Sequence, residues 1–246
     1  MSSFTEAQKS ALSKHIDIYQ ADPDVRNWEW INRWKLIFDQ SKVSLCIQWY
    51  SEDRFKIEKH ICKVPKNVLM AVSPTFADHC SRDPGLITLT FDVGNMDEFS
   101  REHHGIAIRQ LGVWLDDLCA TGGENLQAPT FYSNVALWHV ARQLGMGMYL
   151  PLDTTELVRG AKNYILQPWQ ITELLFISSI ERNATRPIIP RDDPLLCHLA
   201  KQLVNLRPHL CASEKDDVEK WLWNDDNGAL RAATYRLMRK KGIVSP

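Results

Sequence analysis

Residues 63–76 read KVPKNVLMAVSPTF, and this stretch decides the fold class. Its first residues end a strand-like run, and Val68 to Ala71 form a short apolar piece. Ser73-Pro74 follows, and proline fits the first turn of a helix because its missing N–H would have no partner there. The stretch therefore predicts a strand that leads into short helical segments.

Two strand-like runs precede this stretch and one follows it. Residues 43–49 alternate apolar and polar side chains, which is the period of a half-buried strand. Residues 55–64 form a less regular run, and the turn-like segment 51–53 between the two runs predicts a hairpin. A third short strand is expected over 86–90, after the turn pair Pro84-Gly85.

The other segments are predicted to be helices. Leucine and isoleucine residues recur on one helical face over 108–118, whereas residues 131–144 are apolar nearly all round, which predicts a buried helix. Helices are also expected over residues 4–20 and 27–38, from Asp153 to Ile165, and throughout the region after Pro168. The elements together predict an α+β chain.

The composition is that of an ordinary globular protein, with 246 residues, 44% of them hydrophobic, and a formal net charge of −1. No apolar run reaches the roughly 18 residues that a membrane span needs, and the N-terminus lacks the pattern of a secretory signal. The six cysteines are dispersed without a Cys-x-x-Cys pair, which favours free thiols in a reducing compartment. We therefore expect an intracellular protein of the cytoplasm or nucleus.

The sequence contains no motif for catalysis or nucleotide binding. It has no Gly-x-Ser-x-Gly elbow, no Gly-x-x-x-x-Gly-Lys loop and no Gly-x-Gly-x-x-Gly fingerprint. Adjacent acids such as Asp116-Asp117 point about 100° apart on a helix, so they do not converge on one substrate. We therefore predict a protein that is not an enzyme and takes no cofactor.

A zinc site is the remaining chemical alternative. His60 and Cys62 would share one face of a strand, and His79-Cys80 and His103-His104 offer further ligands. Their spacing matches no closed zinc pattern, and buried cysteines with surface histidines explain the same residues. We predict no metal site.

Four segments resemble the BTB/POZ family in their order and spacing. Residues 63–76 resemble its strand, Lys, apolar helix and Ser-Pro-x-Phe signature, and Leu86-Ile87-Thr88-Leu89 resembles its next strand. Residues 111–118 hold a Trp-Leu pair as in the family's next helix, and residues 137–146 resemble its apolar helix ending in Ala-x-x-Leu-Gly-Met.

The resemblance covers residues 41–166. It implies an α+β, BTB/POZ-like core, a small β-sheet with a helical cluster, between an N-terminal helical segment, residues 1–40, and a C-terminal helical extension, residues 167–246. Residues 180–187 and 190–196 are similar to the region that follows the BTB domain in many filamentous-fungal proteins. Pro65 departs from the pattern, since the family usually has His there, and the loop from Asp92 to His104 is longer and more polar than usual.

The resemblance implies a non-catalytic protein–protein interaction scaffold or adaptor that forms a homodimer, because BTB domains often dimerise near their N-terminus. The candidate interface is the aromatic surface around the second helix, and the alternative role of these residues is to pack onto the domain's own sheet or tail. The residues are Trp28, Trp30, Ile31, Trp34 and Phe38.

Two other functions stay open. Many BTB adaptors of cullin-type ubiquitin ligases carry an apolar-x-Glu element before the third strand, and residues 77–85 contain no Glu. A chromatin or transcription regulator would contact nucleic acid at Arg236, Arg239, Lys240 and Lys241. The same cations suit the C-terminal end of a solvated helix, which is the interpretation that composition favours.

Overall fold

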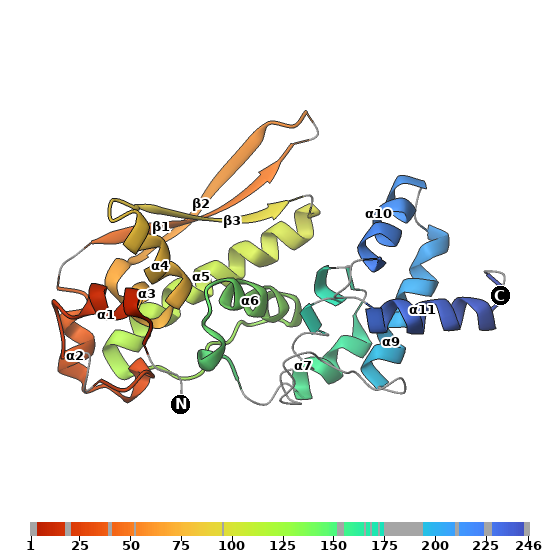
Figure 1. Cartoon of the computed structure of the whole chain (residues 1–246). Helices are drawn as coiled ribbons and strands as arrows, with labels where there is room; N and C mark the ends of the chain where they lie inside the picture. Colours follow the sequence, from red (N-terminus) through yellow and green to blue (C-terminus); the bar gives the residue numbers. More distant parts are fainter. Residues whose placement is uncertain are drawn as a thin grey trace. The chain divides into compact units, whose positions relative to one another are not determined.

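The computed structural model describes residues 4–17, 21–38, 41–51, 53–94, 96–151, 155–164, 166–167, 169–171, 173–174, 194–209, 212–223 and 228–243. The chain forms two compact units, Met1–Pro151 and Leu152–Pro246 (Figure 1). The first unit is α+β and the second contains only helices among its described residues. This division differs from the predicted one: the N-terminal segment 1–40 belongs to the first unit, and the predicted boundary at residue 166 falls inside the second.

A three-stranded mixed sheet forms the centre of the first unit. Its strands are β1 (Lys42–Tyr50), β2 (Lys56–Pro65) and β3 (Thr88–Gly94), in the order β2-β1-β3. β1 pairs with β2 in antiparallel fashion and with β3 in parallel. The predicted hairpin is confirmed, and the third strand begins two residues later than predicted and ends at Gly94.

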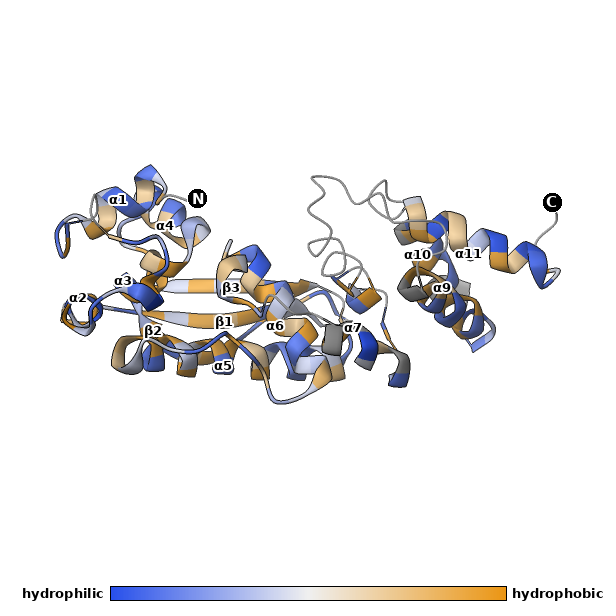
Figure 2. Ribbon diagram, turned by 90° about the horizontal axis from the view of Figure 1, so that it is seen from below, coloured by the Kyte–Doolittle hydropathy of each residue, from blue (hydrophilic) through white to orange (hydrophobic). Residues whose placement is uncertain are grey.

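One face of the sheet is buried against helices, chiefly α5 (Glu98–Thr121) below β2 (Figure 1). Apolar residues follow the strands and the helices beneath them in Figure 2. The buried strand residues are Val43, Leu45, Ile47, Val64, Phe91 and Val93. The opposite face carries polar side chains such as Glu58 and Asp92, as expected for a sheet that faces water on one side.

A β-bulge interrupts β2. Leu45 of β1 pairs with Cys62, but the next residue, Cys46, pairs with His60, so Ile61 is an extra residue. The bulge turns both Ile61 and Cys62 towards α5, where they approach Gly105 and Gly112. His60 and Cys62 therefore lie on opposite faces, and the prediction that they share a face is wrong because an inserted residue breaks the two-residue period.

Ser73 joins the helical pair that follows β2. It ends α3 (Lys66–Val72) and caps α4 (Pro74–Arg82), because its hydroxyl accepts a hydrogen bond from the Phe76 N–H at 3.0 Å. The same buried hydroxyl donates to the Leu144 carbonyl at 2.7 Å and so links the corner to α6 (Phe131–Gln143). The first-turn position predicted for Pro74 is confirmed.

The two long helices, α5 and α6, each contribute a buried apolar face to the core. Leu111, Leu115 and Leu118 of α5 are fully buried, and α6 is buried over most of its length, as predicted. The polar segment from Asp92 to His104, predicted to be a loop, instead contains the end of β3 and the first turns of α5. Its helix begins early because the Asp97 carboxylate accepts from the Ser100 N–H at 2.7 Å, a cap that supports a polar first turn.

The described part of the second unit includes α7 (Thr155–Gly160), η3 (Ala161–Asn163), α9 (Pro194–Leu206), η4 (Arg207–His209), α10 (Ala212–Leu222) and α11 (Gly228–Lys240), with further helical residues at 169–171 and 173–174. α9 packs against α11. The helices predicted around Leu199, Val218 and Leu237 are thus present, whereas the segment 180–187 and most of 190–196 lie outside the described residues. None of the helices in the described ranges is long and apolar enough to cross a membrane.

Gly112 lets α5 approach β2 closely, because a Cβ at this position would lie 3.0 Å from the Cys62 Sγ. We expect Gly112→Val to lower the free energy of unfolding by about 1–3 kcal/mol through overpacking. Urea unfolding measures the effect, and Cys62→Ala in the same chain should recover part of it. Gly147→Val is the control, since nothing lies within 4 Å of a Cβ there; equal losses for the two valine variants would contradict the account.

Candidate protein-interaction surface

The segment before β1 is fastened to the first unit through Arg26. This residue lies in η1 (Val25–Asn27), and its guanidinium forms an ion pair with Asp24 at 2.7 Å and donates to the Asn125 side chain at 2.6 Å. It also lies over the Tyr149 ring, 5.3 Å from the centroid. The hydrogen bond with Asp24 raises the pKa of Arg26, and burial raises the pKa of Tyr149. The segment is therefore held in one position, as is α1 (Glu6–Leu12), whose Gln8 amide donates to the Ala71 carbonyl at 2.8 Å.

Trp28 belongs to this anchored layer. Only 6% of it is exposed, its ring meets Phe4 edge to face at 6.0 Å, and its Nε1 donates to the Asp22 carbonyl at 2.6 Å. Its place in the candidate interface is therefore corrected: Trp28 is a core residue. The number of tryptophans in the sequence could not distinguish this role, because tryptophan is common both in cores and at interfaces.

The next helix, α2 (Trp30–Lys35), buries a single side. Arg33 is 7% exposed, and its Nη1 donates to the carbonyls of Trp28 and, at 3.4 Å, of Arg26. The guanidinium passes beside Gly122, which ends α5 with a φ of 92°. Leu36 is 1% exposed on the same side. The inward side of α2 thus holds one arginine and one leucine.

The outward side of α2 and its following turn holds four large apolar residues, which we call the α2 patch. At about 100° per residue they fall within a sector of about 100° whose centre is opposite Leu36, and Arg33 lies about 60° beyond the edge that Trp30 forms. The patch consists of Trp30 (61% exposed), Ile31 (41%), Trp34 (43%) and Phe38 (71%). The rings of Trp34 and Phe38 lie 6.4 Å apart. The structure thus brings together four of the five predicted interface residues.

The α2 patch has the chemistry of an apolar docking surface. None of its side chains ionises, and two are tryptophans, which are enriched among the residues that dominate binding energy at protein interfaces. Single exposed apolar residues are ordinary, but a contiguous group of large ones marks an interaction site. The alternative role, packing within the chain's own fold, applies to Trp28, which contacts Phe4 and Asp22, and not to these four.

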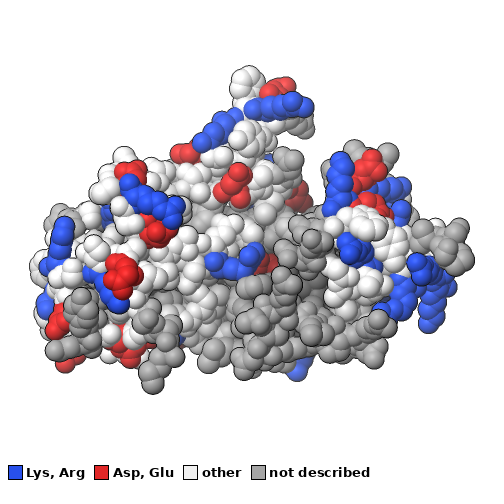
Figure 3. Space-filling view, viewed as in Figure 1, with Lys and Arg blue, Asp and Glu red and all other residues white. Residues whose placement is uncertain are grey.

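The predicted nucleic-acid residues lie in and after α11. Arg236, Arg239, Lys240 and Lys241 are all exposed, and Lys241 donates to the Asn205 side chain of α9 at 3.0 Å. Several Lys and Arg side chains lie on the visible face of the second unit, together with acidic and uncharged ones (Figure 3). Arg231 is engaged differently, since it lies over the Trp223 ring at 4.7 Å.

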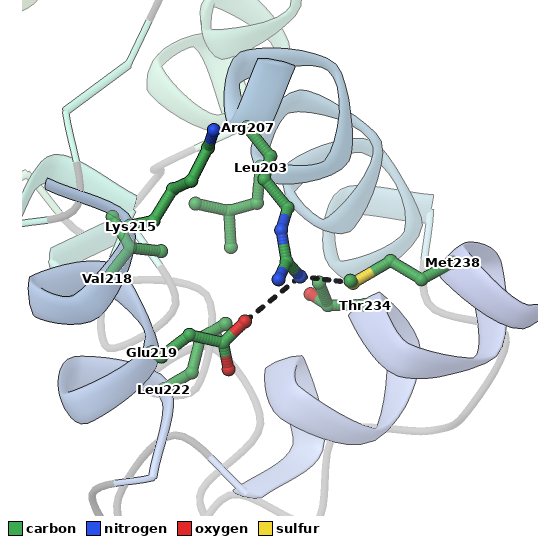
Figure 4. Close-up of a pocket in the computed structure, with 8 residues that line it drawn as sticks. All are labelled: Leu203, Arg207, Lys215, Val218, Glu219, Leu222, Thr234 and Met238. Atoms are coloured by element: carbon green, nitrogen blue, oxygen red, sulfur yellow. Dashed lines mark hydrogen bonds and ion pairs between the residues drawn. The ribbon is translucent and has the colours of Figure 1, made fainter. Parts of the chain in front are cut away.

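A small pocket between α9, α10 and α11 is structural (Figure 4). Its volume is about 20 Å³, room for about one water molecule. Arg207 pairs with Glu219 at 3.0 Å, and the Tyr235 hydroxyl donates to the same carboxylate at 2.6 Å, which raises the pKa of Tyr235. The Arg207 Nη1 also donates to the Met238 sulfur at 3.5 Å. The network ties the three helices together.

The described residues form no nucleophile or metal constellation. Burial raises the pKa of the Cys46, Cys62 and Cys80 thiols and raises that of Cys119 to about 11. Within the described ranges no three His, Cys, Asp or Glu residues are placed to hold a metal ion.

One exposed feature was not predicted. The outer half of the β1–β2 hairpin is exposed to solvent: Phe55 is 71% exposed and Tyr50 is 48% exposed. The signal for it is the density of charged residues over 53–60, where Phe55 and Ile57 are the only apolar side chains.

Comparison of the chain with protein-family models, with curated proteins and with solved structures gives no match.

We expect Arg33→Ala to lower the free energy of unfolding by about 1–3 kcal/mol, because two carbonyls lose their buried donor. Denaturant unfolding measures this. Lys35→Ala is the control at a half-buried neighbour, whose Nζ donates to the Asn32 side chain at 2.9 Å. It should change the free energy of unfolding by less than about 0.5 kcal/mol. An Arg33 variant as stable as the Lys35 variant would show that Arg33 does not fix the orientation of α2.

Thiol labelling tests the burial of the cysteines. Because burial raises the pKa of Cys119 to about 11, about one thiol in a thousand is ionised at pH 8, and less reagent reaches it. We expect iodoacetamide to modify the exposed Cys197 much faster than Cys119 in the native protein, as measured by peptide mass spectrometry. Similar rates for the two would refute the packing of α5.

Proposed function

We propose that this protein is a non-catalytic interaction scaffold that self-associates through the α2 patch. The proposal rests on the exposure of four large apolar residues on α2 and its following turn, while Arg33 and Leu36 are buried on the inner side. The exposed residues are Trp30, Ile31, Trp34 and Phe38. Removing an apolar surface of this kind from water stabilises the complex by about 25 cal/mol per Å² of buried area.

The anchoring of α2 favours tight association. Arg33, Leu36 and the neighbouring Arg26 contacts hold the helix in place before any partner arrives. A surface that is already ordered loses less conformational entropy on binding than a loop that must fold. A second copy presents the same apolar patch, so a two-fold contact buries both.

The order of elements supports membership of the BTB/POZ family as part of this proposal. Hairpin β1–β2, the helical pair α3–α4, strand β3 and helices α5 and α6 follow one another as the resemblance implies. The α2 patch lies just before this core, near the N-terminus, where BTB domains often dimerise. Five free thiols in the described chain support a reducing, intracellular location.

A chromatin or transcription regulator is the second candidate, and one observation favours it. Helices α9 and α11 contain no acidic residue between them, while Arg236, Arg239, Lys240 and Lys241 are exposed. The cullin-adaptor alternative has no such observation, since α4 and the turn after it contain no glutamate.

Disruption of the patch tests the first proposal. We expect Trp34→Asp to weaken self-association at least about thirtyfold, the equivalent of about 2 kcal/mol for a central interface tryptophan. Sedimentation velocity over a range of concentrations measures this. Trp223→Asp is the control, because it replaces another tryptophan that is 62% exposed.

A wild-type chain that stays monomeric at all concentrations would refute the proposal. So would equal effects of the two tryptophan substitutions.

Nucleic-acid binding is tested separately. We expect Lys240→Glu with Lys241→Glu to lower the affinity for duplex DNA at all sequences and to reduce the slope of log affinity against log salt by about 2, since two phosphate contacts are lost. Fluorescence anisotropy measures both. Lys56→Glu with Lys59→Glu, on β2, is the charge-matched control, and absence of binding by the wild-type chain at low salt would exclude this function.

A further inference from the structure

The free edge of β2 is a second surface that fits another copy of this chain. β2 lies at the edge of the sheet, and every residue from Asp53 to His60 is exposed. The outer half of the hairpin projects beyond the helices, so both of its faces are open (Figure 1). No described helix of the first unit therefore blocks a strand that approaches this edge.

The backbone of the edge offers unpaired groups in a known direction. Phe55 is turned towards β1, because its carbonyl accepts from the Ser51 N–H at 2.9 Å and its N–H donates to the Ser51 hydroxyl at 3.1 Å. Backbone groups alternate along a strand, so those of Lys56, Glu58 and His60 point away from β1. They are the groups that an added strand would bond.

The side chains along this edge are self-complementary in one register. In an antiparallel pair of β2 strands related by a two-fold axis at Ile57, Lys56 lies opposite Glu58 of the second copy, and Glu58 lies opposite Lys56. Ile57 then faces Ile57 in a non-hydrogen-bonded pair, the closer kind, with Cα atoms about 4.5 Å apart. Phe55 lies opposite Lys59.

The neighbouring registers are disfavoured by charge. An axis at Glu58 would place Glu58 opposite itself, and an axis at Lys59 would place Lys59 opposite itself. Charged residues usually protect an edge strand from pairing. Here their alternation disfavours the axes at Glu58 and Lys59 and favours the axis at Ile57. The Glu58 Oε2 accepts a hydrogen bond from the Thr90 hydroxyl of β3 at 3.4 Å, and the carboxylate would exchange this long bond for the Lys56 ammonium of the second copy.

We infer that two copies of the chain join their β2 edges antiparallel about Ile57 and so continue the sheet from one copy to the next. The contact is small, with two ion pairs, one isoleucine pair and the outward backbone groups of Lys56 and Glu58, and it is weaker than a standard-sized interface. If the α2 patch also pairs, as the proposed function holds, each copy has two different two-fold contacts, and dimers can join into larger assemblies.

A disulfide trap tests the inference. Ile57→Cys places a thiol opposite its own counterpart at a separation that a disulfide can span. Under mild oxidation the variant should form disulfide-linked dimers at a rate above that of the wild-type chain, as seen on non-reducing gels. Lys59→Cys is the control, since residue 59 is also exposed but lies opposite Phe55 of the second copy. Disulfide-linked dimers that form from Lys59→Cys at the same rate would overturn the register.

Charge exchange gives the decisive comparison. In the Ile57→Cys chain, Lys56→Glu should slow cross-linking by about tenfold, because two Glu–Glu pairs replace two ion pairs. Adding Glu58→Lys restores both pairs with exchanged signs and should restore the rate. Lys63→Glu, an exposed charge of β2 outside the paired segment, should leave the rate unchanged. A double variant as slow as the single one would overturn the proposal.

One further variant distinguishes the β2 contact from association through the α2 patch. Cross-linking through Ile57→Cys should persist when Trp34→Asp is also present. Loss of the cross-link with Trp34→Asp would show that the β2 edges meet only within an α2-dependent assembly and would overturn the independent contact. Persistence, together with unchanged sedimentation of Trp34→Asp alone, would instead refute the α2 proposal and retain this one.

Discussion

The buried guanidinium of Arg33 is the constraint on which the presentation of α2 depends. It bonds the carbonyls of Trp28 and Arg26 beside the end of α5, and a buried arginine is costly to leave without such partners. Once Leu36 points inward, helical geometry directs Ile31 and Trp34 outward, about 140° and 160° from Leu36 around the helix axis. The inner side of α2 thus holds a hydrogen-bonded arginine and Leu36, while four large apolar side chains face solvent.

Much of the fold could be predicted because its signals are local. The alternation over 43–49 identified β1, and Ser73-Pro74 identified the corner between α3 and α4. The early start of α5 was missed because its first turns are polar and are stabilised by the Asp97 cap. The bulge at Ile61 was missed because it depends on the register between two strands, which neither strand encodes alone.

The candidate site was predicted in composition but not in orientation. A helical wheel groups Trp30, Ile31, Trp34 and Phe38, yet it cannot say whether that face is turned in or out. The long-range contacts of Arg26 with Asn125 and of Trp28 with Phe4 decide this, and they join segments far apart in the sequence. The edge of β2 is similar, since its exposure follows from the order of strands in the sheet. Both surfaces lie on regular secondary structure, α2 and β2.

Side-chain footprinting of the α2 patch tests the central claim most directly. Hydroxyl radicals label exposed tryptophans, and mass spectrometry resolves the labels on Trp30 and Trp34 from that on the buried Trp28. The account predicts that labelling of Trp30 and Trp34 falls as the protein concentration rises, while Trp28 stays protected throughout. Labelling of Trp30 and Trp34 that is independent of concentration would contradict it.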